Sequence, residues 1–230
     1  MRNCATSKYF RAHLLDDPHA ECQTLCMSKD EKSPSAATAV APMSADGAHS
    51  FSVRTPDGDT HPRHVCDDCG YIHYVNPKIV VGSVVTWDGA MDGKQRIVMC
   101  RRAIEPSKGL WTLPAGYLEL GESTQAGAAR EAMEEACAEI RIDALLAVYS
   151  IPRISQVQLM YKATLLAPDI KAGEESLDVA LLRYDEIPWD KLAFPSVRWA
   201  LTQYQQVAGL ATFAPFTNPV EDWGDMGNMS

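Results

Sequence analysis

The sequence predicts an α/β (α+β) protein in which helices cover both faces of a mixed β-sheet. Strand-like runs lie on both sides of the helical segment "REAMEEA" (130–136), and a second helical segment follows the last strand. Strands, a helix, more strands and a closing helix are the order expected for a sheet packed between helices. The composition, 46% apolar and 22% charged residues over 230 positions, is that of an ordinary globular protein.

The strand-rich region is predicted to begin with a β-hairpin. Its two strands are "KIVVGSVVTW" (78–87) and "RIVMCRR" (96–102), and the turn residues "DGAMDGKQ" lie between them. Three more strands are expected in "EIRIDALLAVYSI", "VQLMYKATLL" and "DVALLRY". Helical spacing of apolar residues predicts the closing helix over 195–208. These elements suffice for one sheet with helices on both sides.

The first helical segment concentrates acidic residues in a chain whose formal net charge is already -9. Glu131, Glu134 and Glu135 share one helical face, and Arg130 neutralises only part of their charge. Four apolar residues recur on the opposite side at helical spacing: Ala126, Ala129, Met133 and Ala136. We therefore expect this apolar stripe to pack on the core and the carboxylates to point outward. A hard divalent cation such as Mg²⁺ is the alternative to a plain solvated charged face.

Residues upstream of this helix complete a longer pattern. Gly116 is followed after five residues by Glu122, and after seven more by the run "REAMEE" that begins at Arg130. This spacing resembles the Nudix box, the signature of the Nudix hydrolases, and implies an α/β/α sandwich over about residues 77–210. The family pattern ends in glycine, whereas this chain has Cys137. A left-handed helix end costs a cysteine about 1 kcal/mol, so the helix end is where the chain departs from the pattern.

The resemblance also implies roles for the box residues. Glu122 and Arg130 would hold the loop and helix together through charge-assisted hydrogen bonds. Together with the box glutamates they form the predicted catalytic set. The implied ligands for Mg²⁺ or Mn²⁺ are three carboxylates and one backbone carbonyl: Glu131, Glu134, Glu135 and Ala115.

Further residues are candidates for substrate contacts. Phosphate binding is predicted for Arg101, Arg102 and Gly116, with solvated surface charge as the alternative for each arginine. Two loop residues, Glu174 and Glu175, are candidates for the catalytic base, because a loop glutamate serves that role in some family members; an ordinary surface loop is the alternative for both. Adenine stacking or buried packing is expected for three aromatic residues: Tyr117, Tyr149 and Tyr161.

A short segment before the predicted domain has the spacing of a zinc knuckle. Cys66 and Cys69 supply half of a structural zinc site, which needs four ligands. In a zinc-ribbon subgroup of Nudix proteins a first knuckle precedes this one, but Met43 and Asp46 stand where its cysteines would be. The candidates that could complete a site are histidines: His49, His61, His64 and His73. We interpret the segment as a degenerate zinc ribbon, with bound Zn²⁺ as the alternative.

Four regions are predicted along the chain. A poorly ordered extension (1–60) precedes the ribbon remnant (61–76), the Nudix domain (77–210) and a loose tail (211–230). The acidic balance argues against general nucleic-acid binding, and no apolar run is long enough to span a membrane. Seven cysteines without a disulfide framework or signal peptide indicate a reducing compartment. A cytoplasmic location is expected, organellar import stays open, and a homodimer is an open alternative.

The resemblance narrows the substrate class to a small nucleotide diphosphate. The stretches "NPKIVVG", "RRAIEP", "GEESL" and "DEIPWDKLAF" are similar to the zinc-ribbon Nudix proteins that include the plant plastid FAD and ADP-ribose pyrophosphatases. The "SQPWPFP" motif of the NADH pyrophosphatases is missing, and the comparable stretch reads "SIPRISQ". We predict hydrolysis of FAD or ADP-ribose to two monophosphates. An NADH pyrophosphatase and a nucleotide sensor without hydrolysis are the alternatives.

Overall fold

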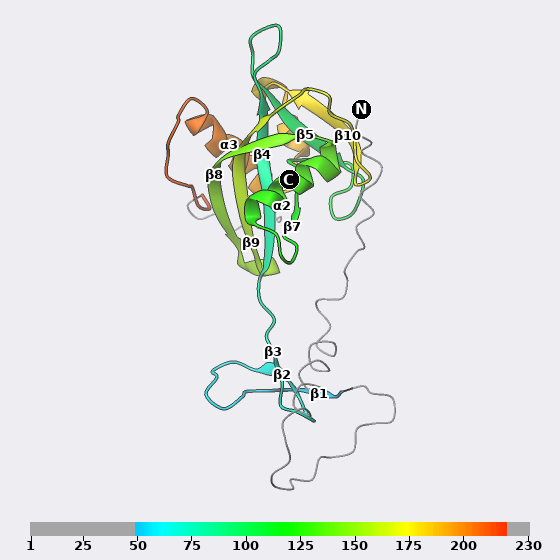
Figure 1. Ribbon diagram of the computed structural model, residues 1–230, viewed down its shortest axis with the longest axis vertical. Coiled ribbons are helices and arrows are strands. Elements are labelled where there is room, and N and C mark those ends of the chain that lie inside the picture. Colours follow the sequence, from blue (N-terminus) through cyan, green and yellow to red (C-terminus); the bar gives the residue numbers. More distant parts are fainter. Residues whose placement is uncertain (1–48, 220–230) are drawn as a thin grey trace. The chain divides into compact units, whose positions relative to one another are not determined.

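The computed structural model describes residues 49–219, and the chain divides between Asn76 and Pro77 into two compact units (Figure 1). The smaller unit is a three-stranded antiparallel sheet in the order β1-β2-β3. Its strands are β1 (Phe51–Arg54), β2 (Arg63–Cys66) and β3 (Ile72–His73).

Strand β1 corrects the predicted boundary of the N-terminal extension. The extension was expected to reach residue 60, yet β1 pairs along its whole length with β2. The carboxylate of Asp67 accepts hydrogen bonds from Ser50, Ser52 and Arg54, at 3.0, 2.6 and 2.8 Å, and so ties the strand to the turn after β2. The rest of the predicted extension, residues 1–48, lies outside the described residues.

The larger unit is built on a seven-stranded mixed sheet. The strand order is β10-β5-β4-β9-β8, with β7 beside β4 and β6 beside β5. Strands β4 and β9 run parallel, and the other pairs are antiparallel. The strands are β4 (Lys78–Trp87), β5 (Arg96–Arg102), β6 (Trp111–Thr112), β7 (Ala115–Tyr117), β8 (Ile140–Ile151), β9 (Gln156–Leu165) and β10 (Ser176–Leu182).

The two α-helices of the described chain pack on opposite faces of this sheet. Helix α2 (Thr124–Ala136) shares a core cluster with Val85 and Val98, and helix α3 (Pro195–Val207) shares another with Val84. Side chains of successive strand residues point to opposite faces, so β4 contributes to both clusters. The predicted α/β/α sandwich is confirmed. Short 3₁₀ helices complete the unit: η2 (Pro152–Ile154), η3 (Tyr184–Glu186) and η4 (Trp189–Lys191).

The first part of the predicted C-terminal tail is fixed to the sheet. The amide of Phe216 donates to the carbonyl of Leu146, and its carbonyl accepts from the amide of Val148, both at 2.9 Å. The side chain of Asn218 bonds the backbone of Ser150 through both its oxygen and its nitrogen. The outer edge of β8 carries unpaired backbone groups, and the chain satisfies them here. The expectation of a loose tail from residue 211 is therefore wrong as far as residue 219, and residues 220–230 lie outside the described range.

None of the helices in the described residues is both long enough and apolar enough to cross a membrane.

Candidate active site

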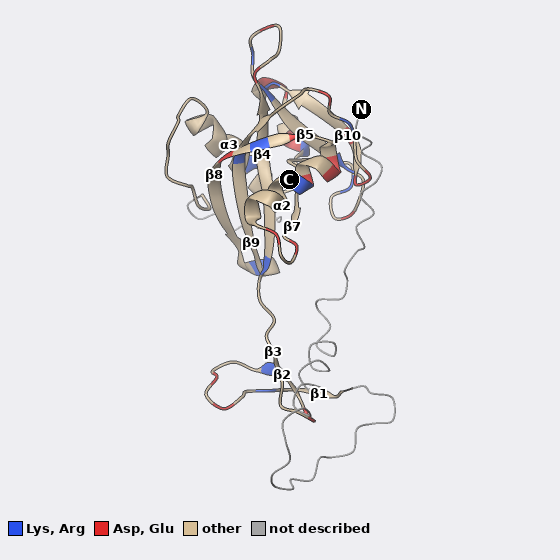
Figure 2. Ribbon diagram, in the orientation of Figure 1, with Lys and Arg blue, Asp and Glu red and all other residues tan. Residues whose placement is uncertain are grey.

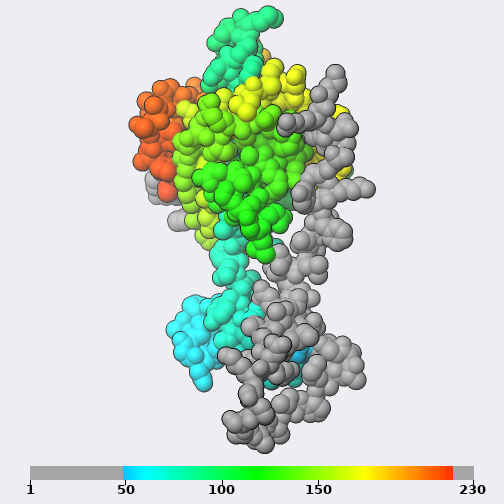
Figure 3. All heavy atoms as spheres, in the orientation of Figure 1, coloured from blue at the N-terminus to red at the C-terminus, as the bar shows by residue number. Residues whose placement is uncertain are grey.

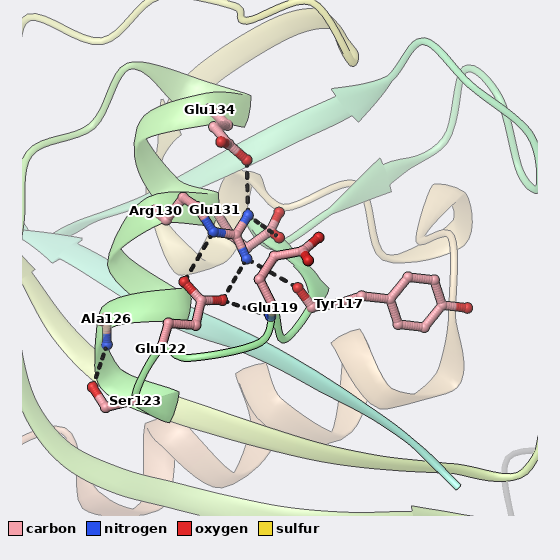
Figure 4. Close-up of polar contacts among 8 residues, drawn as sticks. All are labelled: Tyr117, Glu119, Glu122, Ser123, Ala126, Arg130, Glu131 and Glu134. Atoms are coloured by element: carbon pink, nitrogen blue, oxygen red, sulfur yellow. Dashed lines mark hydrogen bonds and ion pairs between the residues drawn. The ribbon is translucent and has the colours of Figure 1, made fainter. Parts of the chain in front are cut away.

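The guanidinium of Arg130 is the centre of a hydrogen-bond network on α2 (Figure 4). Two of its N–H groups donate to the Glu122 carboxylate, at 2.8 and 3.1 Å. Others donate to Glu131 at 2.7 Å, to Glu134 at 2.9 Å and to the carbonyl of Tyr117 at 2.9 Å. A guanidinium has five N–H donors, and all five are used. Arg130 therefore organises the site and has no donor left for a substrate phosphate.

Hydrogen bonds hold the loop between β7 and α2 at both of its ends. Glu122 also accepts from the amide of Glu119 at 2.8 Å, and its pKa is lowered chiefly by the hydrogen bond from Arg130. Ser123 caps α2 by accepting from the amide of Ala126 at 3.2 Å. Gly127 leaves room beside it, because a Cβ there would lie 2.7 Å from a Glu122 oxygen. The sequence analysis did not single out Gly127, although it lies inside the box.

Helix α2 is rotated relative to the prediction. The buried stripe is Ala128, Ala132 and Ala136, and the predicted core residue Met133 is 39% exposed. Ala136 is buried as predicted, whereas Ala128 and Ala132, each one position before a predicted stripe residue, are the other small residues that let the helix lie close to β4. The helix ends at Cys137, whose left-handed φ of 48° is the conformation in which the family pattern places glycine.

The rotation buries two of the three box glutamates, which corrects the expectation that all three point outward. Glu131 is 8% exposed and Glu135 is 6% exposed, whereas Glu134 lies at the surface. The carboxylate of Glu131 lies over Gly116, where a Cβ would come within 2.5 Å of its atoms. Glu135 accepts a hydrogen bond from the amide of Ala115 at 3.3 Å. Strand β7 thus contacts both buried carboxylates through backbone that carries no bulky side chain.

Burial disfavours the ionised form of both carboxylates in the metal-free protein. Burial raises the pKa of Glu131 to about 7, against the lowering effect of Arg130. Burial and the charge of Glu131 raise the pKa of Glu135 to about 8. Carboxylates whose pKa values are raised by burial within a polar cluster are typical of functional sites. A cation bound at these oxygens would favour their ionised form.

Two further side chains converge on the buried pair. The charge of Arg102 lowers the pKa of Glu135, and the charge of Glu175 raises the pKa of both Glu131 and Glu135. Ser176, the first residue of β10, pairs with Arg102 of β5, which brings the loop glutamate beside the arginine. Figure 2 shows the mixture of acidic and basic residues around α2 and the adjoining end of β10.

The other predicted contact residues are placed differently. Arg101 follows Cys100 on β5, and its side chain donates to the carbonyl of Gly109 at 3.0 Å. Because strand side chains alternate between faces, Arg101 points away from the face that carries α2. Arg102 is the member of this pair whose charge acts on Glu135, and its guanidinium also lies 5.1 Å from the ring centroid of Phe194.

The three tyrosines predicted to stack on adenine also separate. Tyr149 is fully buried in the core and donates to Gln203 at 2.6 Å. Tyr161 is 4% exposed and hydrogen-bonds Thr124. Both are packing residues, as the alternative interpretation had it. Tyr117, which is 51% exposed on β7, is the only one of the three available to a ligand.

The smaller unit holds the one group of potential metal ligands that lies within 4.8 Å in the described part of the chain: His49, Cys66 and Asp68. Cys69 is outside this group, and so are the other candidate histidines, His61, His64 and His73. Structural zinc closes with four ligands, and the described residues bring three together. A 3.2 Å hydrogen bond from His49 to Asp68 already joins two of them. The described ligands do not complete a structural zinc site, and zinc has no part in the chemistry considered below.

Two models of known protein families match this chain. A model of the NUDIX domain matches residues 82–200, which is more than half of the chain, and a model described as Nudix N-terminal, a zinc ribbon, matches residues 47–75. The chain belongs to the Nudix hydrolase family. It is therefore an enzyme of a family that acts on small nucleotide substrates.

Individual relatives support the same assignment. An ADP-ribose pyrophosphatase of Methanocaldococcus jannaschii is 28% identical over 128 residues, which cover 54% of this chain and 71% of that protein. A MutT-like protein of Streptomyces ambofaciens is 34% identical over 108 residues, 47% of this chain and 64% of that one. The crystal structure of a NUDIX hydrolase from Nitrosomonas europaea is 40% identical with a TM-score of 0.68, and the match covers 77% of this chain and 99% of that structure.

Proposed function

We propose that this Nudix hydrolase cleaves the diphosphate of an adenine nucleotide linked to a second group, with ADP-ribose or FAD as the favoured substrates. The observation that carries the proposal is the pair of buried carboxylates: Glu131 is hydrogen-bonded by Arg130 and Glu135 by the amide of Ala115. The 28% identity to an ADP-ribose pyrophosphatase supports ADP-ribose. The stretches shared with the zinc-ribbon pyrophosphatases support FAD equally.

Carboxylate and carbonyl oxygens, the donors that the box residues offer, are the ligands that Mg²⁺ or Mn²⁺ prefers. Mg²⁺ binds through one or two carboxylates together with water and substrate phosphates, so a closed cage of protein ligands is not required. Glu131 and Glu135 would hold the ion, with Glu134 joining from the helix surface and the carbonyl of Ala115 adding an oxygen. When bound, the ion supplies neutralisation of the diphosphate oxygens and a more acidic water.

The chain's own residues then perform the remaining tasks. Arg130 and Glu122 fix the helix and its preceding loop, so the carboxylates keep their positions when substrate enters. We assign to Arg102 the contact with a phosphate oxygen, because its charge acts on Glu135. Glu175 is the loop glutamate whose charge is felt at the buried pair, so we assign it, in preference to Glu174, the removal of a proton from the attacking water. The water oxygen forms a bond to one phosphorus, the bridging P–O bond breaks, and the second phosphate leaves with the bridging oxygen.

Helix α2 and the loop before it form part of the outer surface of the larger unit, as the green atoms in Figure 3 show. A nucleotide can therefore reach this side of the protein without opening the core. The exposed ring of Tyr117, held 5.3 Å from the Lys78 ammonium, is the aromatic surface that adenine would meet there.

The test is a competition assay that contains ADP-ribose, FAD and NADH with Mg²⁺, with products separated by chromatography. We expect kcat/KM for ADP-ribose or FAD to exceed that for NADH by at least about tenfold, which corresponds to about 1.4 kcal/mol of differential transition-state stabilisation. Consumption of NADH first would contradict the substrate assignment. Tight binding of ADP-ribose without product would favour the sensor alternative.

A further inference from the structure

The loop that precedes β10 closes the C-terminal end of α2. The amide of Lys171 donates to the carbonyl of Ala136 at 2.9 Å, and the amide of Gly173 donates to the carbonyl of Glu135 at 3.0 Å. The last carbonyls of a helix have no partner within the helix, so these bonds replace water or a side-chain cap. The loop is therefore docked directly on the helix that carries the box carboxylates.

This docking depends on the absence of a side chain at residue 173. A Cβ built on Gly173 would lie 1.7 Å from the carbonyl oxygen of Glu134 and 2.8 Å from its carbonyl carbon. Both are backbone atoms of a helix, and they cannot move aside as the end of a flexible side chain can. Any other residue at this position would push the loop away from α2.

Two residues later the same loop carries Glu175, which is fixed from the opposite side. Its carbonyl accepts from the amide of Ala103 at 2.8 Å, and the amide of Ser176 donates to the carbonyl of Gly173 at 3.2 Å. The segment thus spans from α2 to the end of β5 with backbone bonds at both ends. The effect of the Glu175 charge on the pKa of Glu131 and Glu135 agrees with this placement.

We propose that Gly173 is a positioning residue, which sets the distance between the Glu175 carboxylate and the box carboxylates by docking the loop on the end of α2. This inference rests on the proposed function, because it assigns to Gly173 a role that is exerted through Glu175. It predicts that the two residues act as one unit in catalysis.

The test compares Gly173→Ala, Glu175→Gln and the double variant, with Gly209→Ala as a matched control. A Cβ at Gly209 meets nothing within 4 Å. We expect Gly173→Ala to lower kcat at least tenfold while KM changes less than threefold, and Gly209→Ala to change neither more than twofold. In the Glu175→Gln background, Gly173→Ala should lower kcat less than twofold further, since coupled residues are not additive. Wild-type kcat in Gly173→Ala, or an undiminished effect in the double variant, would overturn the inference.

Two measurements separate this inference from the proposed function and from misfolding. Hydrogen exchange at the amides of residues 171 and 173 reports the docking without any substrate, and we expect Gly173→Ala to accelerate it at least tenfold. Unchanged exchange overturns the inference, whereas a wild-type protein that cleaves no nucleotide overturns the proposed function. If Gly173→Ala does not fold, Glu175→Asp tests the position directly. The shorter side chain should lower kcat about as much as Glu175→Gln, and full activity in it would contradict a requirement for position.

Discussion

Replacing Gly116 with alanine is expected to separate activity from stability. The new Cβ would lie 2.5 Å from the Glu131 carboxylate, and ordinary contact begins at 3.4 Å, so the carboxylate must move by 3.4 − 2.5 = 0.9 Å. The atoms in the way are the far end of a side chain, and the backbone of β7 can stay in place. A misplacement of about 1 Å in a catalytic group can lower a rate by about 10²-fold. We expect a loss of kcat of about that size.

Stability should change little in Gly116→Ala. The 2.7 Å bond between Arg130 and Glu131 is strained by the shift, but the other four bonds of Arg130 remain. We expect Tm to fall by less than about 4 °C, roughly 1 kcal/mol for a chain of this size. Steady-state kinetics with ADP-ribose and scanning calorimetry measure the two effects, with Gly209→Ala as the control. A wild-type kcat in the variant would show that turnover does not depend on the position of the Glu131 carboxylate.

Three more predictions concern charge and metals. Glu134→Gln and Glu135→Gln should each lower kcat by at least about 10²-fold with the fold retained, as circular dichroism can check; unchanged turnover of both at saturating Mg²⁺ would rule out the metal-ligand assignment. The folded pKa values of Glu131 and Glu135, about 7 and about 8, lie above the ordinary value of 4.5. The stability that their protonated forms contribute to the metal-free protein is fully present below pH 4.5 and is lost as pH rises through 7 to 8. Tm without metal should therefore fall from about pH 4.5 to about pH 8, more steeply than in Glu135→Gln, and a flat profile would contradict the burial argument. Purified protein should contain well below one zinc ion per chain, and a stoichiometric content by elemental analysis would show that the ribbon completes its site with other residues.

The five long strands of the larger unit could be predicted closely from local sequence, whereas the short strands β6 and β7 were not predicted. The strands at 78–87 and 96–102 have the predicted bounds, and α3 ends one residue before the predicted end. These segments are long and strongly apolar, so their periodicity is clear without knowledge of their partners. Strand β1 and the residues around Phe216 were missed because their order depends on pairing with distant strands, which local propensity does not reveal.

The candidate site was predictable in its members but not in its orientation. The box spacing identified the residues that Arg130 brings together, because that spacing specifies a loop and a helix. Which side of α2 is buried depended on the close approach of β7, where Gly116 leaves room for the Glu131 carboxylate. The docking of Gly173 on α2 could not be predicted either, because it depends on a close approach between distant segments. From sequence alone a glycine in a loop indicates a turn, and only the structure shows which atoms a Cβ would meet.

The dependence of hydrolysis on a bound cation is tested by the initial rate of AMP release from ADP-ribose with Mg²⁺ and after its removal by a chelator. Hydrolysis at the buried carboxylates predicts AMP and ribose 5-phosphate in equal amounts, a rate that falls at least about 10²-fold without the ion, and full recovery when Mg²⁺ is restored. Equal rates in the presence and absence of divalent metal would contradict the central claim that Glu131 and Glu135 act through a bound cation.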